Sequence, residues 1–164
     1  MSEGNVYYAQ SNGTCVMRFQ GAISYTLAAG LNRFLDDLFD RGEFKDILVD
    51  LSDTESIDST GLGLLARIAN FVRQRDGRRP LLFSSLPDIN AVLRSICLDD
   101  AFVLCAELPE VGAGQALPAV DASQSELARI VLEAHRLLCD MNQANRDQFQ
   151  NVVDAFERKL GKVL

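Results

Sequence analysis

The sequence is poor in the residues that build metal sites and basic surfaces. Its 164 residues include one histidine, His135, and four cysteines, none in a C-x-x-C pair, which argues against the common zinc sites. The net charge is -7, and a nucleic-acid binder needs a concentrated basic surface. We therefore expect no metal, no cofactor and no nucleic acid. The cysteines lie among apolar residues and are expected to be small core residues: Cys15, Cys97, Cys105 and Cys139.

Long apolar runs are also missing. No run approaches the ~20 residues that are needed to span a bilayer. The first residues, Met1 to Asn5, are polar and lack the apolar core of a secretion signal. We expect a cytoplasmic protein that does not use a membrane. Apolar residues make up 48% of the chain, which is enough for a core in one domain with an extension.

The chain is organised around residues 47–65. A short apolar run, Ile47 to Leu51, predicts a buried strand, and a polar loop is expected from Ser52 to Ser56. A helix should begin next, with Ser59 or Thr60 as its N-cap, because a hydroxyl there can accept a bond from a free backbone N–H. The apolar residues after it predict one broad buried face. A hydroxyl would thus stand at the positive end of a helix.

The segment Asp58-Ser59-Thr60-Gly61-Leu62 resembles the phosphorylatable switch of the STAS family, the anti-sigma factor antagonists. The resemblance extends over roughly Val6 to Leu108. It implies an α/β fold with a mixed, mostly parallel sheet, an N-terminal hairpin and helices on one side. It also implies that Ser59 is the phosphoacceptor, with Thr60 as the alternative. The implied partner-binding residues are Asp58, Ser59, Thr60, Gly61, Leu62 and Gly63.

The chemistry of a phosphate at Ser59 is consistent with this resemblance. A helix N-terminus tolerates an anion, so the added charge of about -1.5 to -2 would change the surface without unfolding the helix. The simpler interpretation is that Ser59 and Thr60 only cap the helix. Gly61 and Gly63 either let a partner come close or pack the helix tightly on the strand. A basic cluster follows and is either solvated surface or a contact for an acidic patch: Arg67, Arg73, Arg75, Arg78 and Arg79.

The rest of residues 1–108 alternates between predicted strands and helices, which indicates a mostly parallel sheet. Asn12-Gly13 predicts a hairpin turn, Gly21 is expected to end the second strand, and Gly42 to end the first helix. The expected strands are Val6 to Gln10, Thr14 to Gln20, Asp46 to Leu51, Pro80 to Ser84 and Ala101 to Cys105. The expected helices are Ser24 to Arg41, Thr60 to Arg75 and Pro87 to Cys97.

The C-terminal third has a different pattern. Residues 109–118 contain two prolines and two glycines and predict a linker between a STAS domain, 1–108, and a helical extension, 119–164. Ser123 or Ser125 can cap a helix, with Glu126 in its first turn. Two apolar stripes, from Leu127 to Met141 and from Phe149 to Leu160, fit one long bent helix or a helical hairpin. They should pack on the protein's own sheet, form a homodimer or serve as a partner-binding arm.

Three other functions are alternatives to a phosphorylatable switch. An enzyme is the first alternative, but the sequence offers no credible Ser/His/Asp set, since His135 lies in the apolar stripe of the tail. The segment from Gly61 to Gly63 also lacks the Lys-Ser/Thr of a P-loop. A receiver domain needs a lysine after its last strand, and none of the three lysines fits: Lys45, Lys159 and Lys162. The remaining alternative is a STAS scaffold or transporter-associated subunit that is not phosphorylated.

The resemblance therefore predicts a non-enzymatic anti-sigma factor antagonist that regulates transcription by partner switching. The unphosphorylated form would bind an anti-sigma factor or a related switch regulator. A serine kinase of the anti-sigma type would phosphorylate Ser59, and a PP2C-type phosphatase would reverse the reaction.

Overall fold

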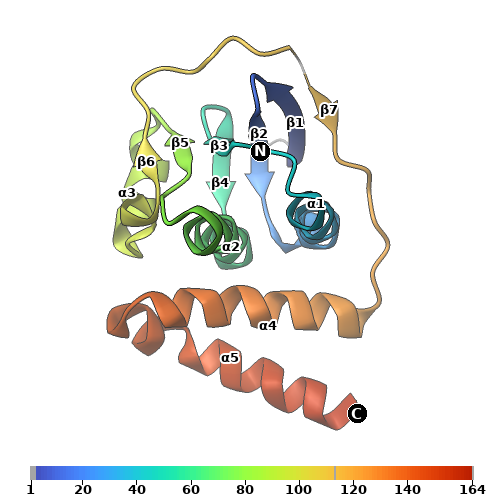
Figure 1. The fold of residues 1–164 in the computed structure, drawn as a ribbon. Coiled ribbons are helices and arrows are strands. Elements are labelled where there is room, and N and C mark those ends of the chain that lie inside the picture. Colours follow the sequence, from blue (N-terminus) through green and yellow to red (C-terminus); the bar gives the residue numbers. More distant parts are fainter. Residues whose placement is uncertain (1–2, 113, 164) are drawn as a thin grey trace.

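A computed structural model describes residues 3–112 and 114–163 of the chain (Figure 1). Within these residues, a 7-stranded sheet has the order β6-β5-β3-β2-β1-β7, and β4 pairs with β2. Its pairs are parallel from the edge strand β6 through β5 and β3 to β2, while β1 pairs antiparallel with β2 and β7. The mostly parallel sheet with an N-terminal hairpin is confirmed. The strands are β1 (Asn5–Ser11), β2 (Thr14–Ile23), β3 (Asp46–Asp50), β4 (Thr54–Ile57), β5 (Leu81–Phe83), β6 (Val103–Leu104) and β7 (Gln115–Ala116).

The helices lie in layers on one side of the sheet. In Figure 1, α1 and α2 pack below the strands, α4 crosses below both of them, and α5 is outermost. None of the described helices is long and apolar enough to cross a bilayer. The helices are η1 (Tyr25–Leu27), α1 (Ala28–Arg41), α2 (Ser59–Asp76), α3 (Pro87–Ser95), η2 (Leu98–Ala101), α4 (Gln124–Met141) and α5 (Gln143–Val163).

The β1–β2 hairpin turns at the predicted residues. Asn12 and Gly13 both have positive φ, 50° and 86°, as this tight turn requires. The predicted end of β2 at Gly21 is wrong, because the strand shifts register after Gly21 and continues to Ile23 beside β4. The expected polar loop from Ser52 to Ser56 is wrong from Thr54 onward, because Thr54–Ile57 forms the strand β4. The buried Thr54 hydroxyl donates a 2.7 Å hydrogen bond to the Phe19 carbonyl, which holds β4 in the sheet.

Two further boundaries differ from the prediction. The first helix begins as the 3-10 turn η1 before continuing as α1, which Gly42 ends as predicted. After α3, Cys97 adopts a left-handed conformation with φ 63° and starts η2. Ala101 is part of η2, so the expected strand from Ala101 to Cys105 is reduced to β6.

The C-terminal segment forms a helical hairpin, which decides between the two predicted forms. Ser123 caps α4, since its Oγ accepts a 3.1 Å hydrogen bond from the Glu126 N–H. The chain is extended at Asn142, whose side chain accepts a 2.8 Å bond from the Asn145 N–H and starts α5. The expected linker is partly a strand, because β7 pairs with β1 and the Tyr8 hydroxyl bonds to Gln115 at 2.7 Å.

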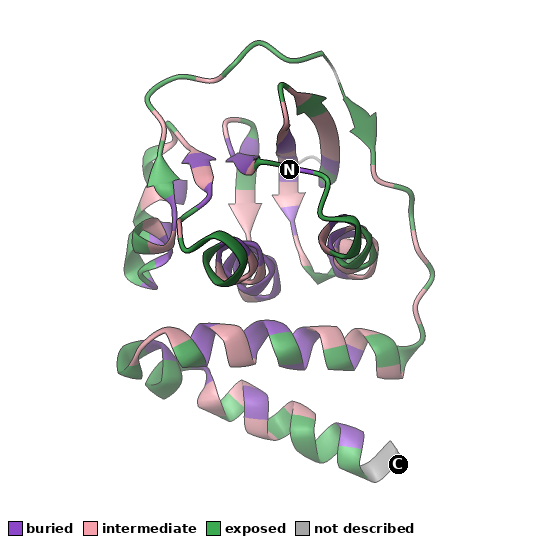
Figure 2. Ribbon diagram, viewed as in Figure 1, coloured by how far each residue is buried: buried purple, intermediate pink, exposed green. Residues whose placement is uncertain are grey.

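Helix α2 is buried on two faces, whereas the sequence predicts one. One face packs on the sheet, and α4 covers the other (Figure 2). A helix that is apolar nearly all round must be enclosed in this way. Consequently the stripe on α4 packs on α1 and α2 of the same chain; packing on the sheet itself was one of the three predicted alternatives. Leu132 and Leu138 of α4 belong to the same hydrophobic cluster as the sheet residues Ile47 and Val49.

The cysteines divide into two groups. Cys15 and Cys139 are buried and Cys105 is half-buried, but the expectation of a core position is wrong for Cys97, which is exposed at the end of α3. All four thiols are free. Burial raises the pKa of the Cys15 thiol to about 11, so Cys15 is protonated near neutral pH.

Alkylation of the folded protein at pH 8 should therefore modify Cys97 rapidly and leave Cys15 unmodified until the protein is denatured. The reason is that only an accessible thiolate reacts, and Cys15 is neither accessible nor ionised. Mass spectrometry of the peptides would measure both rates. Equal rates at Cys97 and Cys15 in the folded protein would contradict this arrangement of the core.

Candidate functional site

Asp58 joins three elements at the start of α2. Its Oδ1 accepts a 2.9 Å hydrogen bond from the Gly61 N–H, and its Oδ2 accepts a 2.8 Å bond from the Tyr25 N–H. Its own N–H donates to the Ile23 carbonyl at the end of β2, at 3.0 Å. Asp58 is therefore the N-cap of α2, and the expectation of Ser59 or Thr60 in that role is wrong. Because Asp58 performs the capping, the Ser59 hydroxyl is left for another contact.

That contact comes from the C-terminal hairpin. The Ser59 Oγ lies 2.8 Å from Nε2 of His135 on α4, and Nδ1 of His135 lies 2.7 Å from the Val131 carbonyl. A carbonyl only accepts, so Nδ1 carries a proton; in the tautomer protonated at Nδ1 alone, Nε2 accepts the Ser59 O–H. His135 is 3% exposed and its ring contacts Phe149 of α5 edge-on, with centroids 5.8 Å apart. Ser59 is half-buried at the junction of α2, α4 and α5.

The expectation that His135, as part of the tail stripe, does not pair with a serine at the start of α2 is wrong. Its place in the tail stripe does not keep it from Ser59, since the fold brings the two together across 76 positions. The pair is not a Ser/His/Asp set, however. The group that orients His135 is the Val131 carbonyl, and both Asp58 carboxylate oxygens accept backbone N–H groups. A lone polar residue inside an apolar stripe is the one sequence signal that pointed to His135.

The other predicted site residues are mostly covered. Thr60 is 4% exposed and Leu62 is 5% exposed. A Cβ atom at Gly61 would lie 2.8 Å from the Ile57 side chain, so Gly61 packs the helix on the sheet. A Cβ atom at Gly63 would lie 2.4 Å from the Ala134 carbonyl oxygen of α4. Gly63 thus allows a close backbone approach, and the backbone that approaches is that of the chain's own tail.

The arginine cluster is largely satisfied within the chain, away from Ser59. Arg67 bonds to Asp36 and Asn32 of α1, and Arg75 stacks over the Phe44 ring at 3.9 Å. A hydrogen bond from Arg75 lowers the pKa of Asp76, and one to Asp46 raises the pKa of Arg78. These arginines brace α2 against the body of the protein. The remaining two, Arg73 and Arg79, line a cavity described below.

The surface near the start of α2 has two accessible features. A shallow cavity of about 570 Å³ lies between the β3–β4 connection and the start of α3, and its rim includes Asp53, Glu55 and Asp88. On the other side, the Tyr25 ring is 52% exposed while the Tyr25 backbone is fixed by Asp58. No pattern in the sequence points to Tyr25. Within the described residues, no group of three or more potential metal ligands is present.

Comparison with known proteins shows which domains share this fold. A model of the STAS domain matches residues 5–110, which is more than half of the chain. No curated protein matches. Two solved structures of SpoIIAA resemble the chain. The first is the anti-sigma factor antagonist in its unphosphorylated form, with 14% identity over 63% of this chain and 89% of that one and a TM-score of 0.52. The second is the Bacillus cell fate determinant in its phosphorylated form, with 16% identity over 62% and 92% and a TM-score of 0.51.

An anti-sigma factor antagonist from Mycobacterium paratuberculosis is similar as well. It shares 19% identity over 65% of this chain and 88% of its own, with a TM-score of 0.53. At these identities the structural likeness shows the fold. The matched regions leave about a third of this chain unaccounted for, while they cover nearly all of each neighbour.

Replacing Asp58 with Ala should destabilise the protein by about 2 kcal/mol, because the variant loses the α2 cap and leaves the Tyr25 N–H without its acceptor. Urea unfolding followed by circular dichroism would measure the loss. Asp53→Ala, which removes an exposed carboxylate from the neighbouring connection, is the matched control and should change stability little. Equal stability of the two variants would show that Asp58 does not organise the site.

Proposed function

Because the chain belongs to the STAS domain family, we propose that it is an anti-sigma factor antagonist controlled by reversible phosphorylation of Ser59. The observation that carries the proposal is the start of α2, where Ser59 is the first helical residue and is not used as the cap. Thr60 is buried beside it, which supports Ser59 as the acceptor. The solved neighbour SpoIIAA, whose two structures are described as unphosphorylated and phosphorylated, offers a precedent for such a pair of states.

The unphosphorylated chain would bind an anti-sigma factor or a related switch regulator through the start of α2. The exposed Tyr25 ring is suited to such a contact, since aromatic residues often anchor interfaces. The acidic rim formed by Asp53, Glu55 and Asp88 suits a partner with a basic surface, to which it would be drawn electrostatically.

A phosphate on Ser59 would end this interaction. It brings a charge of about -1.5 to -2 and a strongly hydrated group to a surface that is already acidic. A like-charge contact costs several kcal/mol, and ~1.4 kcal/mol is tenfold in affinity. The chain would act in the cytoplasm as a substrate and binder, not as a catalyst. A serine kinase of the anti-sigma type and a PP2C-type phosphatase would set its state.

Mass spectrometry of the chain purified from its own host should find a phosphoryl group on the tryptic peptide from Asp46 to Arg67, localised to Ser59. The expectation rests on Ser59 being the more accessible hydroxyl of the pair. A phosphate on Thr60 would keep the mechanism and correct the site. Absence of phosphate under every growth condition would favour the unphosphorylated scaffold.

Substitutions at Ser59 should separate the two binding states. In captures from host extract, Ser59→Ala should retain a regulatory partner in all conditions, and Ser59→Asp should retain at least about tenfold less, in line with the cost of a like-charge contact. Ser85→Asp adds the same charge at an exposed serine outside the switch and is the matched control. If Ser59→Asp and Ser59→Ala capture the partner equally, control does not act through Ser59.

A further inference from the structure

The C-terminal hairpin covers the surface on which the proposed switch depends. Helix α4 crosses the first two turns of α2, where His135 contacts Ser59 and Ala134 contacts Gly63. At Gly63 the two backbones touch, because an ideal Cβ there would stand 2.4 Å from the Ala134 oxygen. The family match ends at residue 110, so α4 is an addition to the matched domain that lies on its switch helix.

The hairpin restricts the approach of a phosphoryl donor to Ser59, which is half-buried. A donor phosphorus must come within about 3–3.5 Å of the attacking oxygen and in line with it. The His135 ring stands 2.8 Å from the Ser59 Oγ and is itself almost fully enclosed by α4 and α5. A phosphoryl group on Ser59 would also need room for three more oxygens beside a buried ring. A kinase active site and the added phosphoryl group would both have more room beside Ser59 if α4 moved away.

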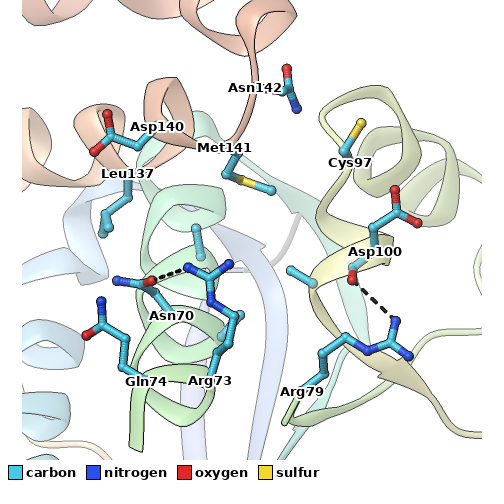
Figure 3. Close-up of a pocket in the computed structure, with 13 residues that line it drawn as sticks. Asn70, Arg73, Gln74, Arg79, Cys97, Asp100, Leu137, Asp140, Met141 and Asn142 are labelled. Carbon is cyan, nitrogen blue, oxygen red and sulfur yellow. Dashed lines mark hydrogen bonds between the residues drawn. The ribbon is translucent and has the colours of Figure 1, made fainter. Parts of the chain in front are cut away.

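The seam between α4 and α2 is incompletely packed. At the far end of the same seam, a cavity of about 630 Å³ opens between α2, η2 and the end of α4 (Figure 3). Its walls include Arg73, which bonds to Asn70, and Arg79, which bonds to the Asp100 carbonyl. Such a gap forfeits the dispersion contacts that a closed seam would supply.

The hairpin is built so that it can leave as a unit. Helix α4 packs more extensively on α5 than on α2, so most of its own contacts would persist. Residues 117–123 connect it to β7 and would reach about 25 Å when fully extended. A second attachment must also release, since the buried Asn145 side chain donates a 2.9 Å hydrogen bond to the Ile96 carbonyl.

We propose that the α4–α5 hairpin covers the start of α2 in the resting protein. The hairpin must move off α2 before a kinase or a partner can reach Ser59. This inference rests on the proposed function, since it concerns access to that site. It makes the chain a regulator that is closed by its own tail. His135 is a positioning residue in this scheme, because it holds the Ser59 hydroxyl and the tail together.

The test compares full-length chains in which the seam is opened. Ala134→Leu overfills the contact with Gly63, and His135→Ala removes the contact with Ser59. Ala155→Leu makes the first change at an exposed site on α5 and is the matched control. Amide hydrogen exchange reports opening, and the initial rate of Ser59 phosphorylation in host extract supplied with Mg-ATP reports access.

In Ala134→Leu and His135→Ala, the amide hydrogens of peptides from α4 and the start of α2 should exchange about tenfold faster than in wild type. The reason is that each substitution disrupts the packing of α4 on α2. Peptides from β3 should be unchanged, which would show that the sheet stays folded. Phosphorylation of Ser59 should accelerate to a similar extent, while Ala155→Leu matches wild type.

Two results would contradict the covering of Ser59 by the hairpin and leave the proposed function standing. One is no faster exchange in either variant, and the other is faster exchange with an unchanged rate of phosphorylation at Ser59. Failure of the proposed function is a different result. In that case Ser59 receives no phosphate in any chain, including the opened ones, and the occlusion is overturned with it.

Discussion

The structure depends on the close crossing of α4 over α2. Gly63 lets the two backbones meet, and this contact brings His135 to Ser59. It also explains why α2 is apolar on two faces, because the sheet encloses one and the tail encloses the other. A helix whose second face was left in water would expose a large apolar area. The tail is therefore part of the core as well as a cover over the switch.

Asp58 lets one short segment stabilise the fold and also carry the proposed switch residue. It caps α2 and anchors η1, so the loop keeps its shape whatever the state of the neighbouring Ser59. The helix N-terminus then offers its positive end to an anion without having to rearrange. Charges elsewhere on α2 support this division, since Arg67 and Arg75 attach the helix to the body of the protein away from Ser59.

The sequence predicted those features that depend on neighbours along the chain. The turn at Asn12-Gly13, the end of α1 at Gly42 and the cap at Ser123 are local, and the structure confirms them. The strand β4 could not be predicted from its own polar residues, because Thr54 is satisfied by a carbonyl 35 positions away. The choice of Asp58 over Ser59 as the cap depends on loop geometry that no spacing reveals.

The contact of His135 with Ser59 was the least predictable feature. Periodicity placed His135 on an apolar stripe but could not show which surface that stripe covers. Only the path of the chain through β7 and across α1 decides that α4 meets the start of α2. The resemblance to the family's switch sequence led to Ser59 as the predicted acceptor, but it could not show which part of the chain covers Ser59.

Nitrogen-15 NMR of the imidazole ring tests the central claim most directly, because His135 is the only histidine and needs no assignment. At a pH where the ring is neutral, the account predicts a single tautomer protonated at Nδ1, with an Nε2 resonance that shifts in Ser59→Ala. A ring that averages between both tautomers and does not respond to Ser59→Ala would contradict it.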